Sequence, residues 1–231
     1  MEAIHIQSFV AAQPDAVWRP LVDRPEVVLD ALPVTAWPER TERCSPTRLL
    51  APWPPVGGVT ATTVEITLAP VASGTRVDLR HEGWQEGPVW QDAIAGHFAG
   101  WLQALAALGL LVESGTDARA SSAGLAGRER YFASGEVPAG ADAAYRALTD
   151  PAVRARWSEG VLDGAEPAEV VESRFARWRL PSGAGGPREL AVILRPTPRG
   201  THCALAEYGV SDRSPSARWP KMLEHLARFL R

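Results

Sequence analysis

The 231 residues carry a formal net charge of −3, which argues against a nucleic acid or an anionic membrane as the partner, since both attract basic surfaces. A composition of 45% hydrophobic and 22% charged residues is that of a globular protein, and the length suffices for two domains that each bury a core. The two cysteines, Cys44 and Cys203, form no CxxC spacing, which argues against a disulfide framework and a zinc knuckle.

The beginning of the chain, MEAIHIQSFVAA, starts acidic and lacks the basic start and the apolar run of a signal peptide. We expect no window to approach the roughly 18 apolar residues of a membrane span. We therefore predict a cytoplasmic protein without such a span. The Gly-rich run PSGAGGP lacks the Lys-Ser/Thr of a phosphate loop, and no GxSxG or HExxH motif occurs, so we expect no cofactor and no metal.

The first expected element is a β-strand in which Ile4, Ile6 and Val10 alternate with residues of the opposite face. A short helix follows, with Asp15 in or just before its first turn, where a carboxylate complements exposed amides and the helix dipole. Residues 27–59 are rich in proline, which disfavours regular strands, so we expect a missing or irregular strand there.

Two antiparallel strands come next, TTVEITL and TRVDLRH, joined by the turn PVASG and each apolar at every second position. A long helix over residues 94–112 closes this half, with His97, Trp101 and Leu105 at helical spacing on one face. This order of elements is typical of a curved sheet that grips its last helix. Space left between the sheet and the helix would form a pocket.

The same order of elements recurs in the second half of the chain, which indicates an internal duplication. The two copies match in the first helix, in the strand hairpin and in the last helix. Matched positions include Val10 and Val137, Asp15 and Asp142, Gly74 and Gly200, Leu79 and Leu205, and Trp101 and Trp219. We predict domains over residues 1–113 and 128–231, joined by a Gly/Ala/Ser-rich linker over residues 114–127.

Three pieces of the first copy carry a resemblance to a known family: the pair Val17–Trp18, the strand GTRVDLRHEGW, and the pair Gly100–Trp101. Together they resemble the bacterial domain family named after the activator of Hsp90 ATPase, within the START/Bet v 1-like (SRPBCC) helix-grip group. The resemblance covers most of both halves. It implies an α+β fold of two tandem helix-grip domains, each a curved antiparallel sheet wrapped around a long C-terminal helix above an apolar cavity. It implies no catalytic residue set.

The second copy departs from the family pattern at three positions. It has Tyr145 in place of Trp18, Glu207 in place of His81, and Arg218 in place of Gly100. Such unequal divergence fits a tandem arrangement that is chiefly structural, with one copy packing on the other as a built-in dimer.

His81 ends the inward face of its strand, where the alternation calls for another apolar residue. It would point into the cavity beside Trp101 and His97, where a neutral imidazole can orient a ligand or move a proton. We favour a structural role, a hydrogen bond to a backbone carbonyl or to the neighbouring loop, because a lone buried polar group is usually satisfied in this way. For His97, too, we favour packing over chemistry.

Glu207 faces inward with Cys203 and Leu205, and a buried carboxylate needs either a partner or a raised pKa. Arg177 or Arg179 of a neighbouring strand is the expected partner. Without one, Glu207 would be the best general acid or base in the chain. His225 is expected to be exposed on the far side of the last helix.

Aromatic residues supply most of the expected cavity wall, since an indole offers a large apolar face and one donor. Five of the tryptophans concentrate in the first copy, where they either line a pocket or fill a small core: Trp37, Trp53, Trp84, Trp90 and Trp101. The predicted ligand-binding residues are Trp18, His81, Trp84, His97, Trp101, Tyr145, Trp178, Glu207 and Trp219.

Four functions follow as hypotheses. The first is a non-catalytic protein that holds a small hydrophobic molecule between the sheet and the last helix. The second is an enzyme of the aromatase/cyclase or hydrolase kind, which requires His81 or Glu207 unpaired at the cavity wall. The third, implied by the resemblance, is an interaction module linked to an Hsp90-type chaperone. The fourth is a scaffold in which the domains pack on each other, or two chains form a homodimer.

Overall fold

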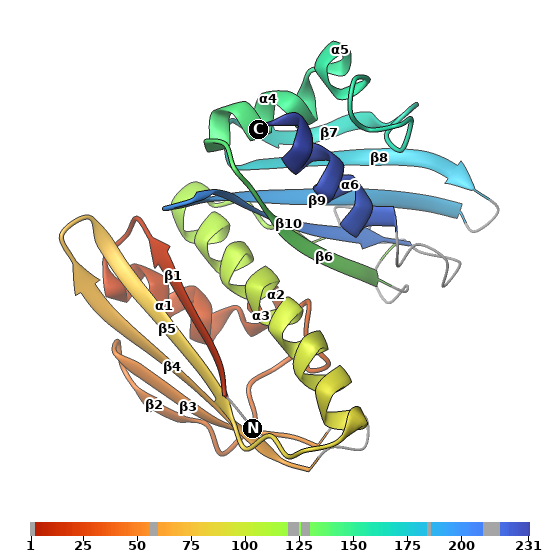
Figure 1. The fold of residues 1–231 in the computed structure, drawn as a ribbon. Helices are drawn as coiled ribbons and strands as arrows, with labels where there is room; N and C mark the ends of the chain where they lie inside the picture. Colours follow the sequence, from red (N-terminus) through yellow and green to blue (C-terminus); the bar gives the residue numbers. More distant parts are fainter. Residues whose placement is uncertain (1–2, 56–59, 120–124, 126–129, 184–185, 210–217) are drawn as a thin grey trace. The chain divides into compact units, whose positions relative to one another are not determined.

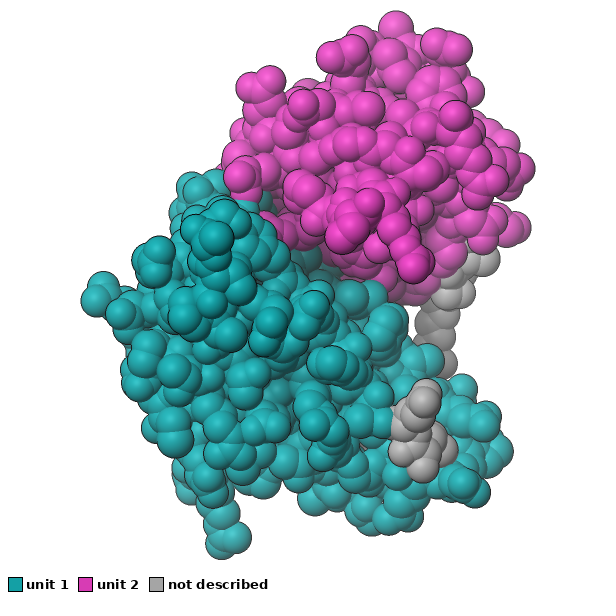
Figure 2. Space-filling model, turned by 60° about the vertical axis from the view of Figure 1, so that its left-hand side comes forward, with its two compact units in different colours: residues 1–117 teal, residues 118–231 magenta. Residues whose placement is uncertain are grey.

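The computed structural model describes residues 3–55, 60–119, 125, 130–183, 186–209 and 218–231. The chain divides into two compact units, Met1–Asp117 (unit 1) and Ala118–Arg231 (unit 2), which Figure 2 colours separately. Each unit is described by itself below.

Unit 1 is a five-stranded antiparallel sheet packed against helices (Figure 1). Its elements are β1 (Ile4–Val10), α1 (Pro14–Asp23), α2 (Pro25–Val28), β2 (Glu42–Cys44), β3 (Arg48–Trp53), β4 (Thr62–Val71), β5 (Gly74–Glu82) and α3 (Pro88–Ser114). The strand order is β1-β5-β4-β3-β2, so the first strand pairs with the last. Helix α3 packs against β1, α1 and α2.

The core of unit 1 is built, as predicted, by apolar side chains at every second position of the strands. Val64, Ile66 and Leu68 of β4 are buried, and Val77 and Leu79 of β5 lie beside them. Their neighbours in sequence face the opposite side of the sheet, as the pleat of a strand requires. The inward side chains and α3 therefore form one continuous apolar core.

Gly100 allows the segment after α2 to approach α3 closely. A Cβ at this position would lie 2.7 Å from Cδ2 of Leu32 and 2.8 Å from the carbonyl oxygen of Ala31. Both distances are shorter than van der Waals contact, so any larger residue would push the two elements apart.

Unit 2 repeats this architecture (Figure 1). Its elements are β6 (Arg130–Val137), α4 (Ala141–Thr149), α5 (Pro151–Arg154), β7 (Glu166–Val171), β8 (Phe175–Gly183), β9 (Gly186–Thr197), β10 (Gly200–Tyr208) and α6 (Arg218–Phe229). The strand order β6-β10-β9-β8-β7 is that of unit 1. The predicted fold class, α+β with two tandem helix-grip domains, is therefore confirmed.

The repeat extends to single hydrogen bonds. Thr75 at the start of β5 donates its hydroxyl to the carbonyl oxygen of Ala12 over 2.7 Å. Thr201 at the start of β10 donates to the carbonyl oxygen of Ala139 over the same 2.7 Å. In both units this bond ties the last strand to the turn that follows the first strand.

The Pro-rich segment of unit 1 keeps its second strand in shortened form, since β2 has three residues. The closing helix is longer than the predicted residues 94–112, because Pro88 starts it at a position where a missing N–H costs nothing. Gly115 then ends it with a φ of 72°, the left-handed conformation that glycine adopts most easily.

Helix α3 also overturns the expectation that no segment is apolar enough for a membrane span. By length and composition alone Pro88–Ser114 meets that test, with a mean hydropathy of 1.5 in its most apolar window. The prediction missed it because His97 and Gln103 interrupt the run. Core helices of water-exposed proteins pass the same test, and 61% of the window is buried.

The predicted linker over residues 114–127 is described only in part, since residues 120–124, 126 and 127 lie outside the described residues. Its described residues Ala118 and Leu125 are buried. The carbonyl oxygen of Arg119 accepts a 2.6 Å hydrogen bond from Arg177 of β8. The domain boundaries at residues 113 and 128 stay a prediction.

Candidate functional site

His81 lies near the end of β5, between Ile4 of β1 and Val64 of β4, and its side chain is fully buried. Its Nδ1 accepts a 3.0 Å hydrogen bond from Nε1–H of Trp101. Because an indole can only donate, Nδ1 carries no proton, and the proton of the neutral ring is on Nε2. Nε2–H donates to the hydroxyl oxygen of Thr62 over 2.7 Å. Both ring nitrogens of His81 are therefore occupied by protein partners.

His97 on α3 adopts the opposite tautomer. Its Nε2 accepts a 3.1 Å hydrogen bond from Nε1–H of Trp53. The proton is then on Nδ1, which donates to the carbonyl oxygen of Ala93, one helical turn earlier, over 2.8 Å. Like His81, His97 has a protein partner at each nitrogen.

Seven rings pack together around these two imidazoles, and we call them the Trp/His cluster: Trp37, Trp53, His81, Trp84, Trp90, His97 and Trp101. The ring centroids of His81 lie 4.4 Å from Trp84 and 5.2 Å from His97. Most of the pairs meet edge to face, the arrangement that aromatic quadrupoles favour.

Two further indole donors of the cluster, those of Trp84 and Trp37, are also used. Nε1–H of Trp84 donates to the carbonyl oxygen of His81 over 2.8 Å, and Nε1–H of Trp37 donates to that of Leu21 over 2.7 Å. Trp37, Trp53 and Trp90 were not among the predicted ligand-binding residues. The concentration of tryptophan in the first copy was the signal that pointed to them.

Burial keeps both imidazoles neutral. Burial, with a smaller contribution from the neighbouring His97, lowers the pKa of His81 from 6.5 to about 3. Burial also lowers the pKa of His97, although the hydrogen bond to Ala93 acts in the opposite direction. A general base or acid needs a pKa near the working pH, so the His81 ring is not suited to proton transfer at pH 7.

Glu207 of unit 2 is fully buried and fully paired. Its Oε1 accepts from Nε of Arg188 over 2.9 Å and also from Nη2 of the same residue. Its Oε2 accepts from Nη2 of Arg218 over 2.9 Å and from Nε1 of Trp219 over 2.5 Å. The requirement for an enzyme, an unpaired Glu207, is not met by this geometry.

The predicted partners of Glu207, Arg177 and Arg179, were wrong. In the register of the sheet Glu207 pairs with Leu190, which pairs in turn with Trp178. Trp178 therefore shares the face of Glu207, and the arginines on either side of it point to the opposite face. Arg177 instead pairs with Glu169 over 2.6 Å.

The other predicted site residues fall into both cores. Trp18 of α1 is buried in the core of unit 1. Trp178 and Trp219 are buried in the core of unit 2, and Tyr145 of α4 is partly buried against it. The structure thus separates the nine predicted residues into two sets, and their role in binding stays a prediction.

His225 is half-buried rather than exposed, and its Nδ1 lies 3.4 Å from Oε1 of Glu159. Six residues after Trp219 correspond to about 240° of helical rotation, which leaves His225 at the border of the buried face and not opposite to it. Within the part of the chain that the structure describes, no three His, Cys, Asp or Glu side chains gather closely enough to hold a metal ion.

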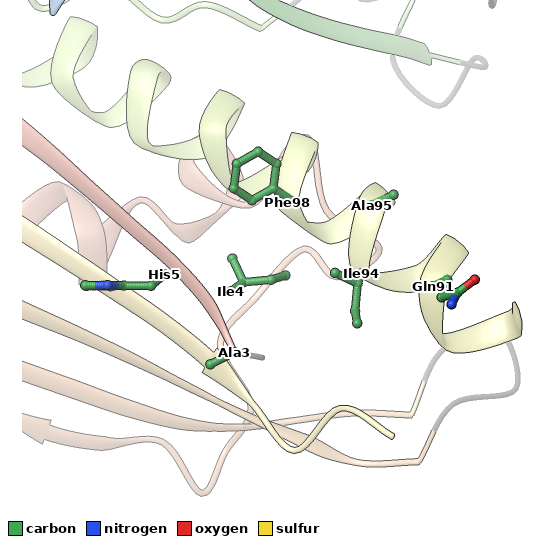
Figure 3. A pocket seen from close by; sticks show the side chains of 7 residues that line it. All are labelled: Ala3, Ile4, His5, Gln91, Ile94, Ala95 and Phe98. Atoms are coloured by element: carbon green, nitrogen blue, oxygen red, sulfur yellow. The ribbon is translucent and has the colours of Figure 1, made fainter. Parts of the chain in front are cut away.

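An open groove of about 860 Å³ lies between β1 and the first half of α3 in unit 1 (Figure 3). Its lining residues are Ala3, Ile4, His5, Gln91, Ile94, Ala95 and Phe98. Phe98 is 43% exposed, which is unusual for a large apolar side chain. The groove was not predicted, because it lies on a face of the helix other than the inward one that carries the predicted site residues. Ile94 and Phe98, one helical turn apart on another face, were the available signal.

No family model matches the sequence, and no curated protein matches it. Several solved structures are similar over long stretches. DynU16, from the dynemicin biosynthetic locus, has 17% identity and a TM-score of 0.44, over 100% of this chain and 96% of that one. The di-domain ARO/CYC StfQ of the steffimycin biosynthetic pathway has 12% identity and a TM-score of 0.36, over 98% of both chains.

The Aha1 dimer from Colwellia psychrerythraea has 15% identity and a TM-score of 0.41, over 50% of this chain and 99% of that one. Similarities at such low identities and TM-scores carry no argument about function. The helix-grip arrangement rests on the strand order and packing of each unit.

Proposed function

We propose that unit 1 binds a small, mostly apolar molecule in the groove between β1 and α3, and that it does so without catalysis. The observation behind this proposal is the groove itself, beside which Phe98 is 43% exposed. Its volume of about 860 Å³ falls within the range of small-molecule sites, about 300–1,000 Å³.

The lining residues define the chemistry of the ligand. Ile4, Ile94 and Phe98 supply an apolar wall, and Gln91 lies at one end of the groove (Figure 3). A carboxamide both donates and accepts hydrogen bonds. The best-fitting ligand therefore has an apolar body and one neutral polar group that reaches Gln91.

The Trp/His cluster is a poorer place for the ligand than the groove. Any molecule that bonded to His81 would have to displace either Trp101 or Thr62, and would leave a buried donor or acceptor unpaired. Leaving a buried donor or acceptor unpaired costs about 1–3 kcal/mol of free energy. The cluster instead supports the groove by holding α3 rigidly on the sheet.

The enzyme hypothesis loses its candidates, since His81 and Glu207 are both paired. The chaperone-linked hypothesis remains an alternative, and direct binding to the bacterial Hsp90 counterpart would support it. Neither has an observation of its own in this structure.

The experiment compares binding of N-phenyl-1-naphthylamine, an uncharged apolar fluorophore, to the full chain and to two variants. Ala95→Trp fills the groove from an exposed helix position, and Ala72→Trp adds the same side chain at an exposed turn of unit 1. We expect saturable binding that Ala95→Trp weakens at least tenfold and Ala72→Trp leaves unchanged. Equal binding by all three proteins, or none by the unsubstituted chain, contradicts the proposal. Native mass spectrometry of protein from its own host then identifies the natural ligand.

A further inference from the structure

Three hydrogen-bonded residues of unit 1, which are all neutral, have counterparts at the equivalent positions of unit 2, two of which are charged. Val64 and Leu190 are the strand partners of His81 and Glu207, respectively. Thr62 and Arg188 each lie two residues earlier on the same strand and on the same face. The triad Thr62–His81–Trp101 of unit 1 thus corresponds to Arg188–Glu207–Trp219 of unit 2, and each is joined by hydrogen bonds.

A fourth residue, Arg218, gives this group a surplus positive charge. Arg188 balances the Glu207 carboxylate, and Arg218, which aligns with Gly100 of unit 1, adds a second guanidinium. The Arg218 guanidinium carbon lies 4.4 Å from the centroid of the Trp219 ring. Stacking and the bond to Glu207 together hold this second cation in a fixed position.

One donor of this group has no acceptor. Nε of Arg218 is buried and has no hydrogen-bond partner among the described residues. Buried donors are nearly always paired, so an unpaired one next to an excess cation points to a missing anion. The side chains of Arg188 and Arg218 are 21% and 33% exposed, so a solute can reach part of each guanidinium group, although not Nε of Arg218 until that side chain shifts.

We propose that unit 2 binds an oxyanion, a carboxylate or phosphate group of a small molecule, at Arg188 and Arg218. The oxyanion pairs with the exposed parts of the two guanidinium groups, takes up the hydrogen bond of Arg218 Nε–H as that side chain adjusts, and compensates the surplus positive charge. Guanidinium groups suit this role because their planar fork matches the oxygen spacing of carboxylates and phosphates. Unit 1 has no counterpart, because its triad is neutral and Gly100 supplies no cation.

The experiment titrates the full chain with inorganic phosphate and, separately, with acetate, at constant ionic strength set with sodium chloride. The reporter is the indole Nε1–H resonance of Trp219, which donates to Glu207 and is assigned by its loss in Trp219→Phe. Arg218→Ala removes the proposed donor. Arg199→Ala removes an exposed arginine from the β9–β10 turn and is the matched control.

We expect a saturable shift of the Trp219 resonance with at least one of the two anions, weakened at least tenfold in Arg218→Ala and unchanged in Arg199→Ala. If Arg218→Ala fails to fold, Arg218→Lys keeps the charge, lacks Nε–H, and is expected to lose binding to a similar degree. A shift that never saturates, or one that both Arg218 variants preserve, overturns the proposal. The result is independent of the groove in unit 1.

Discussion

The indole N–H of Trp101 donates to Nδ1 of His81 across 3.0 Å and so joins the closing helix of unit 1 to the last strand of its sheet. Trp219 makes the corresponding bond in unit 2, over 2.5 Å, to Glu207. The donor has been kept in both copies while the acceptor changed from a neutral imidazole to a carboxylate. This difference has measurable consequences for each unit.

Replacing each donor tryptophan by phenylalanine should cost unit 2 more than unit 1. Trp101→Phe and Trp219→Phe remove similar apolar area and one hydrogen bond each. A bond between neutral groups contributes about 0.5–1.5 kcal/mol, and one to a charged group about 1.5–3 kcal/mol. Urea unfolding, followed for the transition of each unit, measures the two losses. Equal losses would mean that the charge of Glu207 adds nothing to this bond.

Acid should destabilise unit 1 through its buried imidazoles. The folded-state pKa of His81 is about 3 against an ordinary 6.5, so between these values the unfolded chain binds a proton that the folded chain does not. Stability is fully present above pH 6.5 and falls as the pH drops towards 3, by about 2 kcal/mol at pH 5. The free energy of unfolding in urea at pH 7, 6 and 5 gives this slope.

The matched variants for this pH dependence are His81→Gln, which removes a buried imidazole, and His5→Gln, which removes an imidazole with a 60% exposed side chain. We expect the slope to decrease only in His81→Gln, whatever that substitution does to stability at pH 7. An unchanged slope in His81→Gln would show that the pKa of His81 is the same in the folded and the unfolded chain.

Exchanging the triads should reveal strong coupling between Arg188 and Glu207. Glu207→His alone leaves two partly buried guanidinium groups without their carboxylate, a loss of about 3 kcal/mol or more. Adding Arg188→Thr recreates the Thr–His pair of unit 1 and should recover at least about 1 kcal/mol beyond additivity. A double-mutant cycle by urea unfolding measures the coupling. Strict additivity would contradict the equivalence of the two triads.

Two glycines of the same helix should respond in opposite ways to alanine. Gly100→Ala places a Cβ 2.8 Å from the carbonyl oxygen of Ala31, and we expect a loss of about 1–3 kcal/mol. Gly96→Ala meets nothing within 4 Å, and alanine should stabilise the helix by about 0.5–1 kcal/mol. Thermal unfolding of the two variants tests both signs. Stabilisation by both would show that the contact with Ala31 relaxes without cost.

Much of the fold was predictable because it depends on local alternation and on a repeated order of elements. The inward positions of His81 and Glu207 followed from the period of two along their strands, and both are buried. The alignment of the copies also placed Trp101 and Trp219 at matching positions, where each bonds to the predicted strand residue. Periodicity determines the face on which a side chain lies.

Which side chain each buried residue pairs with was not predictable from periodicity. Pairing Glu207 with Arg188 rather than Arg177 depends on the register between β8, β9 and β10, which one strand's pattern does not contain. The groove depends on what the outer side of α3 meets at β1, a contact between segments about ninety residues apart in the chain. Such contacts are settled by tertiary packing.

The pairing of β1 with β5 has a consequence for how the chain is made. Ile4 pairs with His81, so the first strand leaves the ribosome long before its partner exists. The neighbouring strands β4 and β5 are joined by a tight turn and can pair early, because closing a short loop costs little entropy. β1 stays an unpaired apolar segment until β5 is synthesised, and β6 stays unpaired in the same way until β10 is synthesised. Synthesis of this chain therefore passes twice through a state in which an aggregation-prone strand is exposed.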